Sequence, residues 1–255
     1  MGAPEHEPLG DPAALRALRA AAVDDLALIA RLHHAELDDT TLDALRQTQF
    51  PHGLGFRLRS LHGQQALAHL AAVMADFSMP MEVGLRDELA ADYAAIYLTY
   101  GYQASPCESV WLDEENLGMQ APMFQVREFY RFFDLVAEDW RRRSDDHLVL
   151  ELQFLAWLLG STNPQALPEA ARFLDEHLLR WVPQFARRVA TRCATPFYAG
   201  LATLTAAYCD ELRDVLAQVL ESPRPSAEAV EARMKPRPQA QAVPMTYMPG
   251  AAPSW

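Results

Sequence analysis

Apolar residues recur every three or four positions along most of the chain, a spacing that places side chains on one face of an α-helix. Residues 12–34 show the pattern clearly, with apolar side chains three to five positions apart. The other stretches with helical spacing or capping residues are 37–47, 60–77, 83–101, 123–140, 147–159, 166–179, 181–193 and 196–220. The alternation typical of strands is nearly absent. We therefore predict an all-α fold, a single globular bundle of about nine to eleven helices.

The same pattern divides the chain. Residues 1–221 are predicted to form the helical domain, with a weak internal boundary in the long connection at 101–121. Residues 222–255 are rich in proline and poor in core-forming aliphatic side chains, so we expect an irregular, flexible tail there. Pro183 and Pro196 each suit the first turn of a helix, where proline is tolerated.

Charge and cysteine content narrow the class of function. The formal net charge is −12, with 34 acidic residues against 22 lysines and arginines, which argues against nucleic-acid binding. The three cysteines are widely spaced and form no CxxC pair, so neither a disulfide framework nor a zinc site is expected. No signal peptide and no membrane-spanning apolar stretch is evident. We expect a cytoplasmic protein without stable membrane insertion.

The stretch "SDDHLVLELQFL" begins at Ser144 and places acids and a histidine at the start of an apolar helix. Ser144 or Asp145 can cap that helix by accepting hydrogen bonds from its free N–H groups. His147 and Glu151 are one helical turn apart. Together with Asp146 they could be metal ligands, which is the alternative of a helical metal-binding enzyme. No second ligand motif, GxSxG sequence or glycine-rich phosphate loop supports an enzyme.

Two further stretches carry candidate recognition residues. Tyr93, Ile96 and Tyr97 form an aromatic-rich helical stripe, which suits either core packing or the wall of a groove. The loop after this stripe presents a tryptophan beside acids, a common recognition device; its candidate residues are Pro106, Glu108, Ser109 and Trp111. The arginine run 141–143 lies deep inside the chain, so we interpret it as a solvated basic patch.

Three stretches taken together resemble the TorD/DmsD family. They are "DYAAIYLTYGYQASPCESVWLDEE", "SDDHLVLELQFLAWLL" and "RFLDEHLLRWVPQF", and "TPFYAGLATLTAAYCDEL" resembles the family's closing helix. The motifs span roughly residues 88–212 in the family's order. The chain departs from the pattern at Ser144, where many members have proline, at Cys107, often aromatic, and at Tyr97, commonly phenylalanine.

The resemblance implies a cytoplasmic maturation chaperone without catalytic turnover. Such a chaperone binds the twin-arginine signal peptide and the unfinished body of a molybdoenzyme of the dimethyl sulfoxide reductase group, and it delays export until molybdenum cofactor is inserted. Binding of guanine nucleotide or molybdenum cofactor has been proposed in the family, but no motif in this sequence supports either, so we expect no cofactor or metal of the chaperone's own. The family includes both monomers and homodimers. The residues that match positions linked to leader binding are Asp146, His147, Pro106, Ser109, Trp111, Tyr93, Ile96 and Tyr97.

Physical chemistry suggests how such a leader would bind. A leader has a pair of guanidinium groups followed by an apolar segment, so a receptor needs carboxylates and an apolar groove. We expect Asp146, Glu108 and Glu151 to supply the negative charge at the edge of that groove, and the apolar segment to bind as a helix. A structural or oligomerisation module is the remaining alternative.

Overall fold

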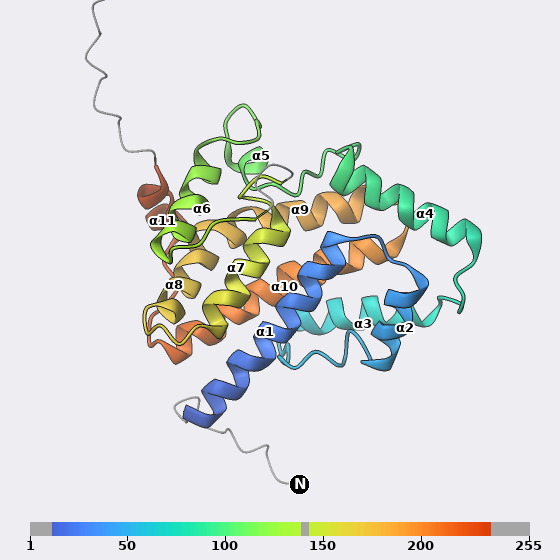
Figure 1. The fold of residues 1–255 in the computed structure, drawn as a ribbon, viewed down its shortest axis with the longest axis horizontal. Helices are drawn as coiled ribbons and strands as arrows, with labels where there is room; N and C mark the ends of the chain where they lie inside the picture. The colour runs from blue at the N-terminus through green and yellow to red at the C-terminus, as the bar shows by residue number, and fades with distance from the viewer. Residues whose placement is uncertain (1–11, 139–142, 236–255) are drawn as a thin grey trace, which may run out of the picture. The chain divides into compact units, whose positions relative to one another are not determined.

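The computed structural model describes residues 12–138 and 143–235, and within these ranges the chain is helical. No strand occurs there, and a single isolated antiparallel bridge joins Cys107 and His147 (Figure 1). The predicted all-α class is therefore confirmed. None of the described helices combines the length and apolar character needed to cross a bilayer.

Most helices follow the predicted stretches, but the helix predicted over 123–140 ends at Phe132, and α5 lies in the stretch predicted as a long connection. Their bounds are α1 Pro12–His34, α2 Asp39–Gln47, α3 Leu61–Ala75, α4 Val83–Tyr93, η1 Ala94–Leu98, α5 Ser109–Leu112, α6 Ala121–Phe132, α7 Leu148–Gly160, α8 Ala166–Phe173, η2 Leu174–Leu178, α9 Leu179–Arg192, α10 Pro196–Val219 and α11 Ala227–Met234. Both η segments are single π-helical turns. The two helices predicted around residue 180 are one continuous run that includes η2, so Pro183 lies inside a helix rather than in a first turn.

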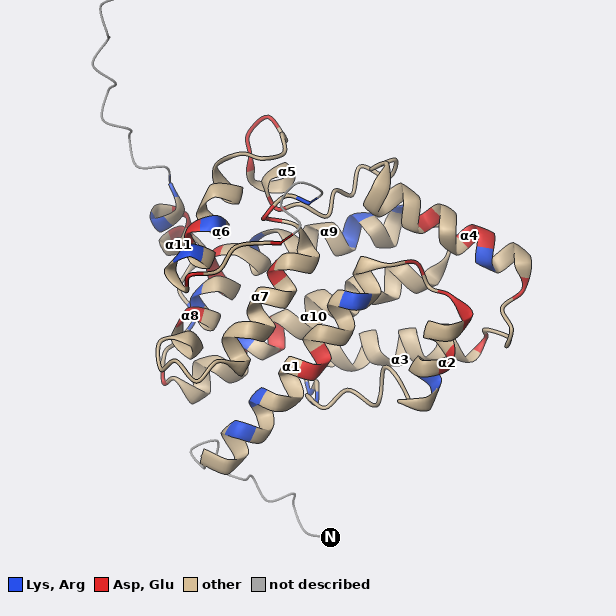
Figure 2. Ribbon diagram, viewed as in Figure 1, with Lys and Arg blue, Asp and Glu red and all other residues tan. Residues whose placement is uncertain are grey.

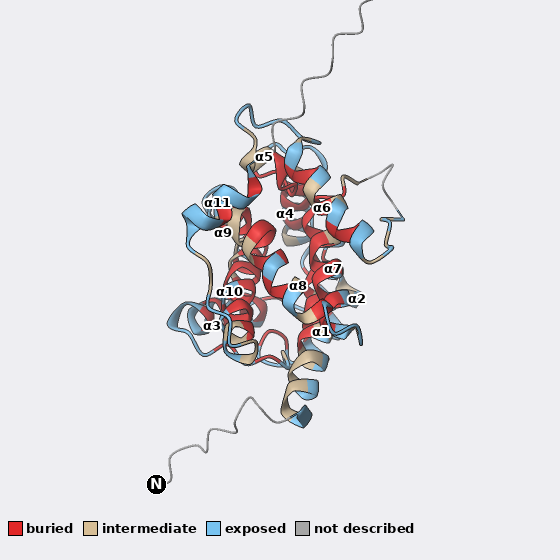
Figure 3. Cartoon of the chain, turned by 90° about the vertical axis from the view of Figure 1, so that its left-hand side faces the viewer, coloured by how far each residue is buried: buried red, intermediate tan, exposed pale blue. Residues whose placement is uncertain are grey.

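The core of the first unit is built around α7 and α10. Helix α7 is apolar on nearly every side, and a helix of that kind must be surrounded by others. Helix α1 packs along α7, while α10 packs against both α9 and α3. Figure 3 shows α7 and α10 as largely buried ribbons. Fully buried aromatic side chains from α9 and α10, such as Trp181 and Tyr198, fill the space between the helices.

Buried carboxylates attach loops to these helices. Asp92 on α4 is fully buried and accepts hydrogen bonds from the backbone N–H groups of Ala194 (3.0 Å) and Thr195 (2.6 Å), and from the hydroxyl of Tyr102 (2.6 Å). These contacts fix the corner between α9 and α10 to the end of α4. A carboxylate suits the position because it only accepts hydrogen bonds and can accept several at once.

Asp25 has a similar role near the other end of the core. Its two oxygens accept from the N–H groups of Gly55 (2.9 Å) and Phe56 (2.8 Å), and Tyr208 donates its hydroxyl at 3.0 Å. Burial raises the pKa of the Asp25 carboxyl, and its hydrogen bonds oppose that rise. The loop before α3 is thereby attached to α1 and α10.

The chain divides into two units, Met1–Pro225 and Ser226–Trp255. In the second unit, α11 begins at Ala227, and the hydroxyl of the preceding Ser226 accepts from the N–H of Ala229. A serine cap followed by alanine and glutamate favours a helix, so the expectation of an irregular tail is wrong for this stretch. Residues 236–255 of the expected tail lie outside the described residues, as do Arg141 and Arg142 of the arginine run.

We predict that Asp92→Asn lowers the free energy of unfolding by about 2–4 kcal/mol, because the amide faces backbone donors with one acceptor fewer. Chemical denaturation measures this effect. Asp87→Asn, an exposed change on the same helix, is the control and should shift stability by less than about 0.5 kcal/mol. Equal, small effects of the two changes would contradict the anchoring role of Asp92.

Candidate functional site

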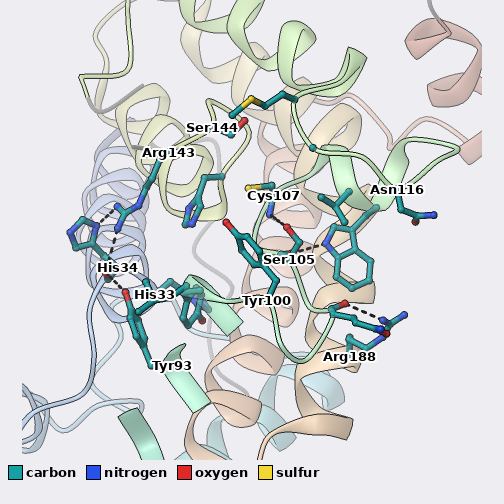
Figure 4. Close-up of a pocket in the computed structure, with 18 residues that line it drawn as sticks. His33, His34, Tyr93, Tyr100, Ser105, Cys107, Asn116, Arg143, Ser144 and Arg188 are labelled. Atoms are coloured by element: carbon teal, nitrogen blue, oxygen red, sulfur yellow. Dashed lines mark hydrogen bonds between the residues drawn. The ribbon is translucent and has the colours of Figure 1, made fainter. Parts of the chain in front are cut away.

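A cavity of about 940 Å³ opens between the end of α1, η1, the loop around α5, the start of α7 and α9. Its wall is aromatic and basic. The lining residues are His33, His34, Tyr93, Tyr97, Leu98, Tyr100, Gln103, Ser105, Cys107, Val110, Trp111, Asn116, Gly118, Met119, Arg143, Ser144, His147 and Arg188. Figure 4 shows many of these side chains converging on the cavity from separate elements. We refer to this cavity as the pocket.

One side of the pocket depends on a short backbone pairing. The N–H of Glu108 donates to the carbonyl of Asp146 at 2.9 Å, and the N–H of Leu148 donates to the carbonyl of Pro106 at 2.8 Å. Two loops that lie far apart in the sequence are thus joined in antiparallel fashion around the bridge between Cys107 and His147. This pairing holds the loop before α5 against the start of α7.

The side chain of Asp146 strengthens this junction. It is fully buried, and one of its oxygens accepts from both the N–H (2.7 Å) and the hydroxyl of Ser109, the first residue of α5. The other oxygen accepts from the hydroxyl of Ser144. The carboxylate is therefore committed to the loop and does not reach the pocket wall.

His147 caps α7, and the predicted caps Ser144 and Asp145 are wrong. The Nδ1 atom of His147 accepts from the N–H of Val149 at 3.2 Å. Asp145 instead forms an ion pair with Arg127 at 2.6 Å. Burial, followed by the charge of Arg143, lowers the pKa of His147 to about 3, so its imidazole is neutral at physiological pH.

Glu108, Glu151 and His177 form a buried acid network behind the wall. Glu108 pairs with Nδ1 of His177 at 2.8 Å, and both side chains are fully buried. Glu151 accepts from Nε1 of Trp181 at 3.1 Å and hydrogen-bonds Glu108. Burial, then the charges of Glu108 and Asp146, raise the pKa of Glu151 well above its ordinary value. The raised pKa favours the protonated form of Glu151, which can donate to Glu108.

The aromatic wall is held by hydrogen bonds from its polar ends. Tyr93 donates its hydroxyl to the carbonyl of His34 at 2.6 Å, and Tyr97 is 2.6 Å from Nδ1 of His33. Trp111 donates from Nε1 to the carbonyl of Ser105 at 2.8 Å. The rings are thereby fixed in place.

The charge of the wall is positive, which differs from the expected acidic edge. Arg143 and Arg188 line the pocket, and the guanidinium of Arg188 lies 5.5 Å from the ring of Trp111. No aspartate or glutamate belongs to the described lining. The expectation that Asp146, Glu108 and Glu151 edge the groove is therefore corrected, because each is fully buried in internal hydrogen bonds.

The predicted site residues thus fall into two groups. The structure brings Tyr93, Tyr97, Trp111 and His147 together in the pocket wall. The others, Pro106, Glu108, Ser109, Asp146, Glu151 and Ile96, are buried behind it. Pro106 contributes a carbonyl to the backbone pairing, while Ile96 belongs to the core.

Several lining residues were not indicated by sequence. Tyr100, Gln103, Asn116 and Met119 have φ values of 50–60°, a left-handed conformation that is uncommon outside glycine. Left-handed backbone conformations at residues other than glycine are found most often at functional sites. A neighbouring glycine, as at Gly118, or an asparagine is the only local signal, and it does not indicate a pocket.

The geometry does not favour metal or nucleophile chemistry. In the described parts of the chain, no group of three or more His, Cys, Asp or Glu side chains is placed to hold a metal ion. The metal alternative fails locally because Asp146, His147 and Glu151 each have different hydrogen-bond partners. Burial raises the pKa of the Cys107 thiol far above its ordinary value, so it stays protonated.

Comparison with known proteins places the chain in a family. Residues 62–187 match the family model described as nitrate reductase delta subunit. The chaperone protein TorD of Psychrobacter sp. (strain PRwf-1) is 31% identical over 201 residues, which cover 76% of this chain and 90% of that protein. The chain belongs to the TorD family.

Two further relatives support the assignment to this family. The TorD chaperone of Actinobacillus succinogenes is 31% identical over 177 residues, covering 66% of this chain and 84% of that protein. The selenate reductase assembly chaperone protein of Thauera selenatis is 34% identical over 112 residues, covering 40% of this chain and 58% of that protein. Since its TorD-family relatives are named as chaperones, the prediction of a chaperone rather than an enzyme is confirmed.

We predict that His147→Ala lowers the free energy of unfolding by about 1–2 kcal/mol through loss of the cap on α7. His147→Asn should recover most of that loss, since the side-chain oxygen of asparagine can accept from the N–H of Val149. Urea denaturation of the three proteins measures the effect. An asparagine variant no more stable than the alanine variant would contradict the capping role.

We predict a pH effect for Glu151→Gln. The folded pKa of Glu151 is raised, so its stabilising contribution is full below the unfolded pKa and is lost as pH rises through the folded pKa. Glutamine donates to Glu108 at any pH, and the variant should therefore gain stability relative to wild type as pH increases above about 4.5.

Denaturation over a pH series measures this difference, with the exposed change Glu128→Gln as control. The control should show a difference from wild type that varies little with pH. A Glu151→Gln difference that is just as flat would show that Glu151 is ionised in the folded protein.

Proposed function

We propose that this chain is a maturation chaperone that binds the twin-arginine leader of an exported molybdoenzyme and delays its export until the molybdenum cofactor is in place. Its relatives include chaperones named TorD and a selenate reductase assembly chaperone, which supports a reductase as client. The proposal places the protein in the cytoplasm, where the leader is still attached to its enzyme. It requires no catalytic residue and no cofactor bound by the chaperone.

The pocket is the observation that carries the proposal. It is lined by Tyr93 and Tyr97 of the aromatic helix, by Trp111 of the loop that follows, and by His147 of the aspartate–histidine pair. The family resemblance associates these segments with leader binding. Tyr93, Tyr97 and Trp111 offer apolar ring surface, and a cavity of about 940 Å³ is large enough for several side chains. The apolar segment of the leader is the part that matches this wall.

The arginine pair of the leader requires a different surface. Arg143 and Arg188 repel guanidinium groups from the pocket itself. Glu114 and Glu115 are exposed on the loop after α5, immediately before the lining residue Asn116. Figure 2 shows acidic residues on this loop. We assign the arginine pair to these two glutamates, while the net charge of −12 assists the approach of a basic leader.

The experiment is a calorimetric titration of the full chain with synthetic twin-arginine leader peptides from the molybdoenzymes of the same organism. We expect one leader to bind. We also expect the double change Glu114→Gln with Glu115→Gln to weaken the binding of that leader about three- to tenfold at low salt. The effect should be smaller at high salt. Failure of wild type to bind any of these leaders would contradict the proposed function.

A matched control is available on α4, where Asp87 and Glu88 are also adjacent and exposed. Asp87→Asn with Glu88→Gln removes the same charge and should leave affinity within about twofold of wild type. A leader in which glutamines replace the arginine pair should bind wild type and the Glu114/Glu115 variant equally well. Equal weakening by both double changes would show a general effect of net charge instead of local recognition.

A further inference from the structure

The pocket holds two polar groups whose hydrogen-bonding directions are fixed by buried partners. One is the hydroxyl of Tyr97 in η1, and the other is Nε2 of His147 at the start of α7. Both residues line the pocket and are at least nine-tenths buried. The direction of each follows from a proton count along its partners.

The count for Tyr97 begins at Thr205 on α10. The Thr205 hydroxyl lies 2.8 Å from the carbonyl of Leu201, which can only accept, and 2.8 Å from Nε2 of His33. Nδ1 of His33 lies 2.6 Å from the Tyr97 hydroxyl. Three donors are satisfied only if Thr205 donates to Leu201, His33 donates from Nε2 to Thr205, and Tyr97 donates to Nδ1 of His33.

This arrangement leaves Tyr97 without a free proton. In the reverse arrangement, His33 donates from Nδ1 to Tyr97, and the tyrosine proton then has no partner among these groups. Burial lowers the pKa of His33 to about 3, so a doubly protonated ring does not compete with either arrangement. The arrangement that satisfies all three donors internally is favoured, and in it the Tyr97 oxygen has only lone pairs left, so it acts as an acceptor.

His147 has the opposite polarity. Its Nδ1 accepts from the N–H of Val149, and a neutral ring with an accepting Nδ1 carries its proton on Nε2. No acceptor for this N–H is found among the described residues, although the side chain is only 5% exposed. Because Nε2 is not completely enclosed by protein atoms, its N–H is open to the pocket, where water or a ligand supplies the acceptor.

We propose that the pocket binds a non-helical stretch of the leader, with Nε2–H of His147 donating to a backbone carbonyl and the hydroxyl oxygen of Tyr97 accepting from a backbone N–H. We assign His33 and Thr205 as positioning residues that keep Tyr97 an acceptor. A helical segment satisfies its own backbone groups, whereas an extended segment leaves both kinds of group free. This inference rests on the proposed function and replaces the expectation of a helical ligand.

Replacing single backbone N–H groups of the leader tests the proposal. The probe is the leader that binds in the titration above, with each residue of its apolar segment N-methylated in turn. At one position, methylation should weaken binding to wild type about five- to tenfold. Methylation at that same position should weaken binding to the Tyr97→Phe variant by less than twofold, because this variant already lacks the accepting oxygen. If a side-chain amide of the leader were the donor to Tyr97, N-methylation would not weaken binding at any position. That result would overturn the proposal.

Thr205→Val tests the positioning role, because it keeps the side-chain shape but removes the acceptor for Nε2–H of His33. Thr203→Val is the control, since Thr203 also donates its hydroxyl one turn back on α10, to Ala199, at 2.8 Å. Imidazole nitrogen-15 shifts should show His33 protonated on Nε2 in wild type and in Thr203→Val, and on Nδ1 in Thr205→Val. Thr205→Val should bind the leader about fivefold or more weakly, while Thr203→Val binds normally.

The outcomes separate the two proposals. If no leader binds wild type, the proposed function fails and this inference fails with it. If a leader binds but the methylation scan is the same in wild type and Tyr97→Phe, only the inference is overturned. A wild-type His33 protonated on Nδ1, or a folded Thr205→Val that binds like Thr203→Val, would overturn the positioning role.

Discussion

The pairing between residues 106–108 and 146–148 is the constraint on which the pocket depends. Two backbone hydrogen bonds join the loops, and the Asp146 carboxylate adds the N–H and hydroxyl of Ser109. Because the pairing is buried, water cannot replace a lost partner, and the junction is costly to open. It places Trp111 and His147 in the pocket wall, which they share with Tyr93 and Tyr97.

The acidic composition has more than one physical role. A large share of the buried polar residues are acids; they are Asp25, Asp92, Glu108, Asp145, Asp146, Glu151, Glu176 and Glu211. Such groups persist in a core because each accepts from backbone, side-chain or cationic donors. The acids at the surface account for the net charge and its effect on a basic partner. Net charge alone therefore does not indicate the sign of the pocket, which is positive.

The helices were predictable from sequence because their apolar faces must be buried, and burial imposes a period of 3.6 residues. Four residues that the resemblance links to leader binding line the pocket, namely Tyr93, Tyr97, Trp111 and His147, and their part in binding stays a prediction. The resemblance did not distinguish residues in the wall from those that support it, since both lie in the same motifs. Asp146 and Glu108 belong to the motifs because they fix the loop.

Other features of the site depend on contacts between distant segments, which no local pattern records. Arg188 enters the wall from α9, three residues beyond Phe185, the last residue of the quoted stretch that contains His177. The cap on α7 is a histidine, a residue type that cap preferences do not favour. The left-handed backbone at Tyr100 and Gln103 follows from how the loop packs, not from its residue types.

The central claim is that the pocket receives the apolar segment of a leader. Photo-cross-linking measures this most directly, with benzophenone side chains placed along that segment and the adducts mapped by mass spectrometry. The account predicts adducts on residues of the wall, among them Tyr97, Met119 and Trp111. Adducts confined to another surface, such as the exposed face of α3, would contradict it.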